Sequence, residues 1–320
     1  MTKKDFKIVF FGTPEFAVAS LAKLVDEGYN IAAVVTMPDK PAGRGRQILQ
    51  SDVKKYALEH NLPILQPEKL KSEDFIGQLR NINADLFIVI AFRMLPEAVW
   101  QMPKYGTFNL HASLLPKYRG AAPLNWAVIN GDKETGVTTF FLKHEIDTGD
   151  IIQQKKINIY DNDNVGTVHD KLMALGADMV IETVNAIIAG TVKTIPQNQL
   201  CDGIEPTPAP KIFKDTCHIK WDNSANSVHN LVRGLSPYPA AWCYFEKDGK
   251  EHQLKIFETS ITDMPTNGAI HGTVKTDKNS IYVARADNYL QIKSLQLSGK
   301  KRMDSAAFLR GFTLDSAILK

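Results

Sequence analysis

The chain has 320 residues, which exceeds one typical hydrophobic core and suffices for a main domain with a smaller one. Hydrophobic residues make up 44% and charged residues 23%, as in an ordinary soluble globular protein. No apolar run approaches the ~20 residues of a membrane span, and Cys201, Cys217 and Cys243 lack the number and spacing of a disulfide framework or zinc site. We therefore expect a reduced, cytoplasmic protein without a metal or a membrane partner.

Short apolar runs alternate with helical patterns through the first half of the chain. The β-rich runs occupy residues 7–12, 29–36, 62–65, 85–91 and 106–112. Strand and helix repeated in this way predict an α/β fold with a doubly wound, mainly parallel, Rossmann-like sheet that is covered on both faces. Two further strands within 136–159 and a long helix near 167–189 complete the expected first domain, residues 1–190.

The pattern changes after residue 190. Residues 191–207 are rich in proline and lack periodicity, which predicts a linker. Residues 208–320 contain one helical pattern and several short alternating runs, which predict a small β-barrel domain. This part holds 16 lysine and arginine residues against 11 acidic ones, a balance of +5. Such a balance is compatible with a polyanionic partner, although a solvated lysine surface is the more common explanation.

The stretch "NLHASLLP" places two polar residues, Asn109 and His111, in an otherwise apolar strand. Because strand side chains alternate, both point to one face, near the carboxyl end where open α/β sheets bind ligands. Asp147, in the later loop "EIDTGD", can approach the same edge. An amide, an imidazole and a carboxylate together suit acyl transfer, since they can polarise a carbonyl and orient the histidine. Satisfied core residues are the alternative explanation.

Longer motifs favour an acyl-transfer site over satisfied core residues. The segment "NLHASLLPKYRGAAPLNWAVINGDKETGVT", followed by "IDTGD", resembles the folate-dependent formyltransferases, and "FFGTPEFAV" and "PDKPAGRGRQ" extend the similarity over essentially the whole chain. The resemblance implies that Asn109, His111 and Asp147 form the catalytic trio. It also implies that a turn and a strand end bind the folate; their residues are Ser113, Leu114, Leu115 and Pro116, and Ile90, Ala91 and Phe92. Where many relatives carry a glycine, "AFRMLP" has Arg93, so the pterin contacts stay open.

The resemblance further implies the substrates. The formyl donor is 10-formyltetrahydrofolate, and the acceptor is the α-amino group of methionine on initiator Met-tRNA. An OB-like C-terminal barrel is expected to contact the tRNA, with Lys300, Lys301 and Arg302 as candidates. We expect a monomer, and no DNA partner. A formyltransferase acting on glycinamide ribonucleotide or a nucleotide-linked amino sugar, and a non-catalytic RNA-binding protein, are the alternatives.

The segment "MPDKPAGRGRQ", residues 37–47, carries a second set of candidate tRNA contacts: Lys40, Arg44 and Arg46. Its two prolines and two glycines argue against a regular helix or strand, so we expect an irregular loop. A solvated loop is the simplest interpretation. The resemblance instead implies that this loop enters the acceptor end of the tRNA and that Arg44 is its principal contact.

Overall fold

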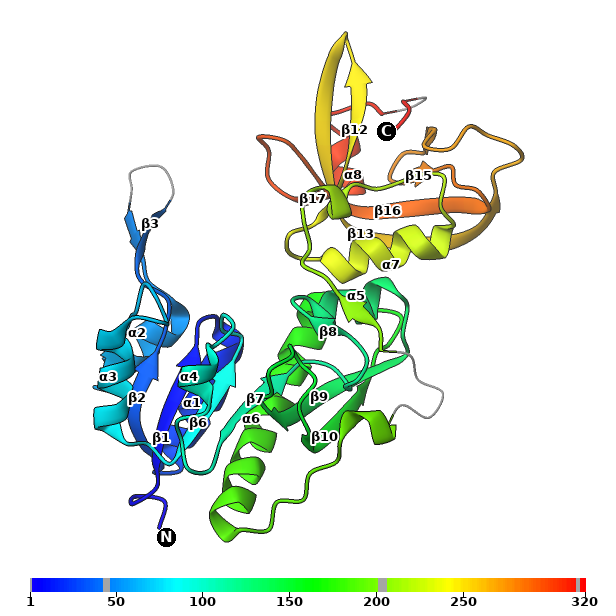
Figure 1. Ribbon diagram of the computed structural model, residues 1–320. Helices are drawn as coiled ribbons and strands as arrows, with labels where there is room; N and C mark the ends of the chain where they lie inside the picture. Colours follow the sequence, from blue (N-terminus) through cyan, green and yellow to red (C-terminus); the bar gives the residue numbers. More distant parts are fainter. Residues whose placement is uncertain (1, 43–46, 201–205, 315–316) are drawn as a thin grey trace. The chain divides into compact units, whose positions relative to one another are not determined.

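A computed structural model describes residues 2–42, 47–200, 206–314 and 317–320 of the chain (Figure 1). The chain divides into two compact units. Unit 1 comprises Met1–Gly120, Gly136–Ile157 and His169–Pro208, and unit 2 comprises Ala121–Thr135, Asn158–Val168 and Ala209–Lys320. The second unit therefore includes two segments from the middle of the sequence as well as the C-terminal part.

Unit 1 is built on a seven-stranded sheet in the order β10-β9-β7-β6-β1-β2-β5. The strands are β1 (Lys7–Gly12), β2 (Asn30–Val35), β5 (Ile64–Leu65), β6 (Leu86–Ile90), β7 (Thr107–His111), β9 (Glu134–Phe141) and β10 (Ile151–Asn158). Pairing is parallel from β5 to β7, whereas β9 runs antiparallel to β7. The predicted mainly parallel sheet is confirmed. The central strands β1 and β6 are buried nearly throughout, as expected of a sheet covered on both faces.

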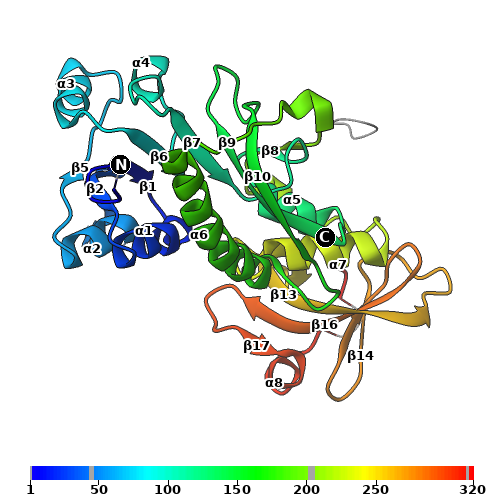
Figure 2. The same ribbon diagram turned by 90° about the horizontal axis from the view of Figure 1, so that it is seen from below.

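Helices cover both faces of this sheet (Figure 2). They are α1 (Glu15–Asp26), α2 (Asp52–Glu59), α3 (Glu73–Ile82), α4 (Glu97–Trp100) and α6 (Val165–Ala189). In Figure 2, α1, α2 and α6 lie on one face and α3 and α4 on the other. On the second face, Phe75 and Leu79 of α3 belong to one buried cluster with Phe11 and Val89 of the sheet. The central strands are thereby held firmly, and the polar groups at their carboxyl ends start from fixed positions.

The long helix α6 is apolar over much of its length. By length and composition it could cross a membrane, although half of its most apolar stretch is buried within the protein. The sequence shows no unbroken apolar run of this length, because scattered polar residues interrupt the helix. Leu172, Met179, Val180 and Val184 are among its buried side chains, and burial of this kind is what a core helix requires.

The prediction of an irregular loop at residues 37–47 is wrong in part. Strands β3 (Lys40–Ala42) and β4 (Gln47–Leu49) pair antiparallel, with Lys40 opposite Leu49 and Pro41 opposite Ile48. A two-stranded ribbon has two edge strands, each paired on one side only, and an edge strand tolerates a proline that a central strand would not. Residues 43–46, including Arg44 and Arg46, lie outside the described residues.

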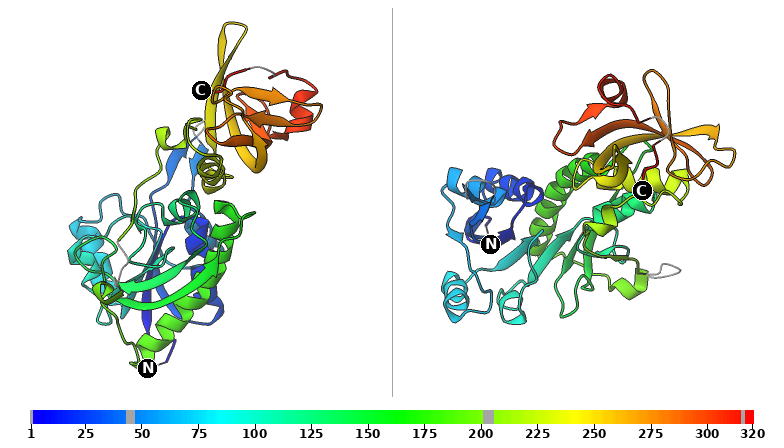
Figure 3. Two further views of the ribbon diagram at one scale, coloured as in Figure 1. Left: turned by 90° about the vertical axis from the view of Figure 1, so that its right-hand side faces the viewer. Right: turned by 90° about the horizontal axis from the view of Figure 1, so that it is seen from above.

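Unit 2 is an antiparallel half-barrel with helices packed against it (Figure 3). Its sheet has the order β12-β13-β16-β15-β14, with β17 paired to β16. The strands are β12 (Ala241–Lys247), β13 (Lys250–Pro265), β14 (Val274–Thr276), β15 (Ile281–Val283), β16 (Asn288–Leu297) and β17 (Met303–Asp304); the helices are α5 (Pro123–Ile129), α7 (Ala225–Leu235) and α8 (Ser305–Leu309). Register shifts along β13 and β16 bend the sheet. The predicted C-terminal β-domain is confirmed as this half-barrel.

The remaining short elements lie between these larger ones. They are β8 (Arg119–Gly120), η1 (Gln197–Leu200), β11 (Pro208–Ala209) and η2 (Asp215–Cys217). After α6 the chain returns to the sheet of unit 1, where Ile195 bridges to Ile151 and Gln197 is buried. The start of the proline-rich segment is thus packed against unit 1, and this packing matters for the site described next.

Candidate active site

Strand β7 positions the two polar residues that the sequence singles out. Asn109 lies between Val89 of β6 and Phe140 of β9, and His111 lies opposite Thr138 of β9. Two residues apart on one strand, Asn109 and His111 share a face of the sheet. Asn109 is partly exposed, whereas only 7% of His111 is accessible. The strand therefore presents an amide and a largely buried imidazole at its carboxyl end.

The two ring nitrogens of His111 have different partners. Nε2 lies 2.8 Å from the carbonyl oxygen of Tyr118. Because a carbonyl oxygen can only accept, Nε2 carries the hydrogen of this bond. Nδ1 faces Asp147, whose Oδ2 is 3.9 Å away, an ion-pair separation longer than a hydrogen bond. The geometry fixes the ring through Nε2 and leaves Nδ1 as the nitrogen that can respond to a substrate.

Asp147 is held from both sides of its loop. The backbone N–H of Gly120 donates to Asp147 Oδ2 at 2.9 Å, so the oxygen that faces His111 is also fixed by the main chain. Asp147 itself has a left-handed backbone, with φ of 55°. Such a conformation is unfavourable for most side chains but is tolerated by aspartate, and it persists where neighbouring contacts secure it. The contacts of the Asp147 carbonyl supply that support.

Gln197 provides these contacts, and sequence reasoning missed it. Its side-chain Nε2 donates to the carbonyl oxygens of Asp147 and Gly149, both at 2.9 Å. Its Oε1 accepts from Arg119, through Nη2 at 2.6 Å and Nε at 3.1 Å. Gln197 is 3% exposed, so this bridge is shielded from water. The residue lies in a segment without periodicity, and a contact across 50 positions leaves no local signal that could have revealed it.

The predicted folate turn, Ser113 to Pro116, lies beside His111 and is internally bonded. Thr138, the strand partner of His111, donates to Ser113 O at 2.6 Å and accepts from the Leu115 N–H at 3.2 Å. Ser113 Oγ donates to Lys117 O at 2.7 Å. Ser113, Leu115 and Pro116 are buried, and Leu114 is partly exposed. The Ser113 hydroxyl is thus engaged within the turn, and its contacts keep the backbone after His111 in place.

The predicted pterin segment lies on the neighbouring strand. Ile90 is the last residue of β6, is fully buried and pairs with Leu110 of β7. Ala91 is exposed and has a positive φ of 46°, and the Phe92 ring lies 5.7 Å from that of Phe11. The segment therefore leaves the sheet one strand away from Asn109 and His111.

Arg93, the departure from the family pattern, is tied to backbone carbonyls. Its guanidinium donates to Glu68 O at 2.9 Å and also to Pro67 O. Burial lowers the pKa of Arg93 from its usual value. These bonds anchor the Arg93 head to the backbone of residues 67–68, so its charge is engaged there.

The candidate tRNA contacts that the structure describes are exposed cations. Lys40 is exposed at the start of β3, and Lys300 and Lys301 are exposed in the turn between β16 and β17. Arg302 is also exposed, but its Nε donates to Ser294 Oγ at 2.8 Å and its guanidinium lies 4.5 Å from the Phe257 ring centroid. Their role in binding stays a prediction. Within the described ranges, histidine, cysteine and acidic residues form no group of three or more able to hold a metal.

A Rossmann-like sheet with an amide, an imidazole and a carboxylate at its edge can bind a carbonyl group and stabilise its oxyanion. Residues 6–184 match the family described as formyl transferase, and residues 211–313 match the formyl transferase C-terminal domain. The chain belongs to the formyl transferase family, as the sequence motifs predict.

Similar proteins of known function show to which group within the formyl transferase family the chain belongs. A methionyl-tRNA formyltransferase from Bacteroides fragilis is 58% identical over 99% of this chain and 98% of its own length. Another, from Porphyromonas gingivalis, is 48% identical over 99% of this chain and 98% of its own. Within the formyl transferase family, the chain belongs with the methionyl-tRNA formyltransferases.

Solved structures share the fold. A sugar 3N-formyl transferase, crystallised in the presence of dTDP and 5-N-formyl-THF, superposes with a TM-score of 0.63 at 22% identity, covering 92% of this chain and 99% of that chain. An N-formyltransferase from Helicobacter canadensis, in complex with folinic acid and dTDP-3-aminofucose, gives a TM-score of 0.64 at 18% identity, covering 93% of this chain and 100% of that chain. At these identities the likeness concerns the fold alone.

Proposed function

We propose that this enzyme transfers a formyl group from 10-formyltetrahydrofolate to the α-amino group of methionine carried by initiator Met-tRNA. The observation that carries the proposal is the gathering of Asn109, His111 and Asp147 at one sheet edge in a chain 58% identical over 99% of its length to a methionyl-tRNA formyltransferase. These substrates place the protein in the cytoplasm, where aminoacylated tRNA is used.

The site residues divide the work of acyl transfer. The neutral amine of the methionyl group attacks the formyl carbon, a new C–N bond forms, and the carbonyl oxygen becomes an oxyanion. The Asn109 amide donates a hydrogen bond to that oxygen, and His111 in its protonated form donates through Nδ1. Collapse of the intermediate breaks the bond between the formyl carbon and the folate nitrogen. The proton lost by the amine moves to that nitrogen along the path that His111 and Asp147 border.

Asp147 acts by position and charge. Its Oδ2 accepts from the Gly120 N–H and faces His111 Nδ1, so the carboxylate stabilises a positive imidazole and holds its orientation. The turn at 113–116 follows β7, the strand end at 90–92 belongs to the neighbouring strand β6, and together they supply the walls for the folate. A mainly apolar wall with few polar groups is typical of a site for a planar cofactor-like substrate.

Parallel assays with three different acceptors test which one the enzyme formylates. Purified protein is incubated with formyl-labelled 10-formyltetrahydrofolate and, in separate reactions, with initiator Met-tRNA, glycinamide ribonucleotide or a dTDP-linked amino sugar. We expect label in Met-tRNA only, with N-acetylated Met-tRNA as the control that lacks a free amine. Preferential formylation of either small acceptor would assign the enzyme to another branch of the family. RNA binding without any formyl transfer would favour the non-catalytic alternative.

A further inference from the structure

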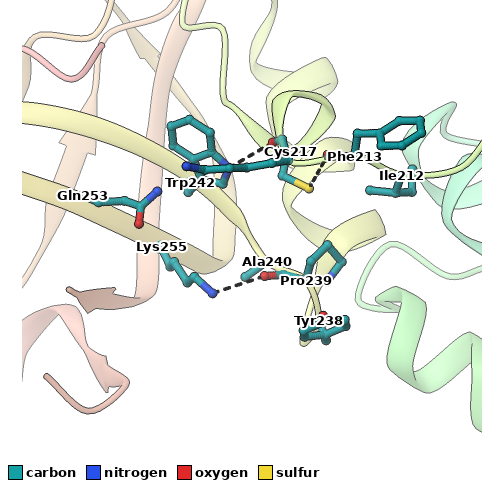
Figure 4. A pocket seen from close by; sticks show the side chains of 10 residues that line it. Ile212, Phe213, Cys217, Tyr238, Pro239, Ala240, Trp242, Gln253 and Lys255 are labelled. Atoms are coloured by element: carbon teal, nitrogen blue, oxygen red, sulfur yellow. Dashed lines mark hydrogen bonds between the residues drawn. The ribbon is translucent and has the colours of Figure 1, made fainter. Parts of the chain in front are cut away.

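Unit 2 contains a pocket that none of the candidate residues above explains (Figure 4). Its volume is about 410 Å³, within the range of about 300–1,000 Å³ that is usual for small-ligand sites. It lies between the segment around η2, the turn that joins α7 to β12, and the outer face of the β12–β13 hairpin. The residues that line it are Ile212, Phe213, Lys214, Cys217, Tyr238, Pro239, Ala240, Trp242, Gln253 and Lys255.

Aromatic rings surround this pocket, and two of them are unusually exposed. Tyr238 is 83% exposed and Phe213 is 62% exposed. Trp242 is fixed instead: its Nε1 donates to Lys214 O at 3.1 Å, and the His218 ring stacks on it at 4.3 Å and 17°. Neither exposed ring is needed to fill the core of unit 2. The pocket therefore combines a rigid aromatic wall with two rings that are open to a ligand.

The charges at the pocket have one sign. Lys214 Nζ lies 5.4 Å from the Trp242 ring centroid, and Lys211 Nζ lies 5.7 Å from that of Phe213. Lys255 reaches the backbone oxygen of Pro239 at 3.5 Å, at the limit of a hydrogen bond, so its ammonium group remains available. The lining residues given above include no carboxylate. A ligand that contacts this pocket should therefore carry negative charge next to a flat apolar group.

We propose that the pocket binds an unpaired nucleotide of an RNA chain, with the base against Tyr238 and Phe213 and the adjoining phosphates on Lys211, Lys214 and Lys255. Stacking of bases on aromatic side chains, together with a cationic track for the backbone, is how proteins hold single-stranded nucleic acid. A free anion would not require the rings, and an apolar peptide would not require the lysines. The inference rests on the proposed function, because it assigns one contact of unit 2 with the tRNA substrate.

The test measures how much the bases of an RNA, as opposed to its backbone, contribute to binding by the full-length protein. A fluorescent single-stranded RNA hexamer of mixed sequence and an abasic hexamer of the same length are titrated at fixed salt. We expect the mixed hexamer to bind at least tenfold more tightly than the abasic one. Replacing both exposed rings (Tyr238→Ala with Phe213→Ala) should remove that difference, whereas Lys214→Ala with Lys255→Ala should weaken both probes and flatten the salt dependence.

Control variants separate the pocket from the general surface. Tyr160→Ala removes a ring of unit 2 that is 59% exposed but does not line the pocket, and Lys278→Ala removes an exposed lysine outside it. Both controls should bind the two probes as the unmodified protein does. Equal binding of the hexamers by the unmodified protein, or an unchanged preference in the ring variant, would overturn the inference.

Formyl transfer, measured separately, distinguishes this inference from the proposed function. In the ring variant, we expect a raised KM for Met-tRNA with kcat and the KM for folate unchanged. If the protein formylates Met-tRNA but the ring variant keeps its normal KM for tRNA, the pocket assignment fails and the enzyme assignment stands. If base-dependent binding requires the rings but no acceptor is formylated, the proposed function fails and the pocket remains an RNA site.

Discussion

The two ring nitrogens of His111 have different roles, since Nε2 bonds to Tyr118 O and Nδ1 faces Asp147. Asparagine places its amide near the Nδ1 position and glutamine near the Nε2 position. We expect both His111→Asn and His111→Gln to lose about 10²-fold or more in kcat, because neither supplies a positive charge. The asparagine variant should retain more activity, because it keeps a donor on the side that faces the substrate. Steady-state kinetics at saturating folate measure this order, and a more active glutamine variant would show that the anchoring nitrogen was misassigned.

Gln197 acts on the reaction through Asp147, as a positioning residue. Gln197→Leu keeps a side chain of similar size but removes the bonds to the Asp147 and Gly149 carbonyls. We expect kcat to fall about tenfold, roughly 1.4 kcal/mol, because Asp147 loses support for its left-handed backbone, while the KM for folate stays the same. Gln199→Leu, an exposed neighbour in η1, is the matched control.

A purely structural role for Gln197 would lower the thermal stability and leave kcat close to that of the unmodified protein. Equal kcat values in Gln197→Leu and Gln199→Leu would therefore contradict the positioning role.

The loop between β9 and β10 depends on one glycine for its shape. A Cβ atom added at Gly149 would lie 1.6 Å from the backbone oxygen of Phe141, a separation that only backbone movement can relieve. Gly149→Ala should lower the free energy of unfolding by about 1–3 kcal/mol and displace Asp147, so that kcat falls as well. Gly77→Ala, in the interior of α3 with open space around it, should raise stability by about 0.5–1 kcal/mol. Urea denaturation checks both, and a neutral Gly149→Ala would refute the close approach.

The β3–β4 hairpin carries the basic segment that we propose to contact the acceptor end of the tRNA. The strands present Lys40 at their base, and Arg44 lies in the connection outside the described residues. Arg44→Ala should lower kcat/KM for initiator Met-tRNA by more than about tenfold, ~1.4 kcal/mol, with little change in the KM for folate. Arg44→Lys should restore only part, because the charge is kept but the planar guanidinium is lost.

The preference between tRNAs separates this role from a general electrostatic one. The unmodified protein and Arg44→Ala are compared on initiator Met-tRNA and on a variant tRNA with a strong terminal base pair. If the hairpin senses how easily that pair opens, the arginine variant should discriminate less between the two. An unchanged preference would argue against the hairpin as the selecting element.

At the scale of the whole molecule, the sheet and the half-barrel could be predicted because their signals are local. Alternating strands and helices specify the parallel sheet, and the placement of Asn109 and His111 follows from strand periodicity and the carboxyl-end rule. The support given by Gln197 could not be predicted, since it depends on a distant return of the chain. Likewise, Pro41 can lie in a strand because β3 is paired on one side only. A rule that counts prolines against strands does not take this into account.

The central claim is that the trio on this sheet edge transfers a formyl group to Met-tRNA. Single-turnover transfer of labelled formyl groups, with enzyme in excess over Met-tRNA and folate saturating, tests it most directly in the unmodified protein and in His111→Ala. We predict rapid transfer by the unmodified protein, a rate lower by ~10²–10³ in the variant, and unchanged folate affinity in both. Transfer by His111→Ala at a near-normal rate, or no transfer to Met-tRNA by the unmodified protein, would contradict the account.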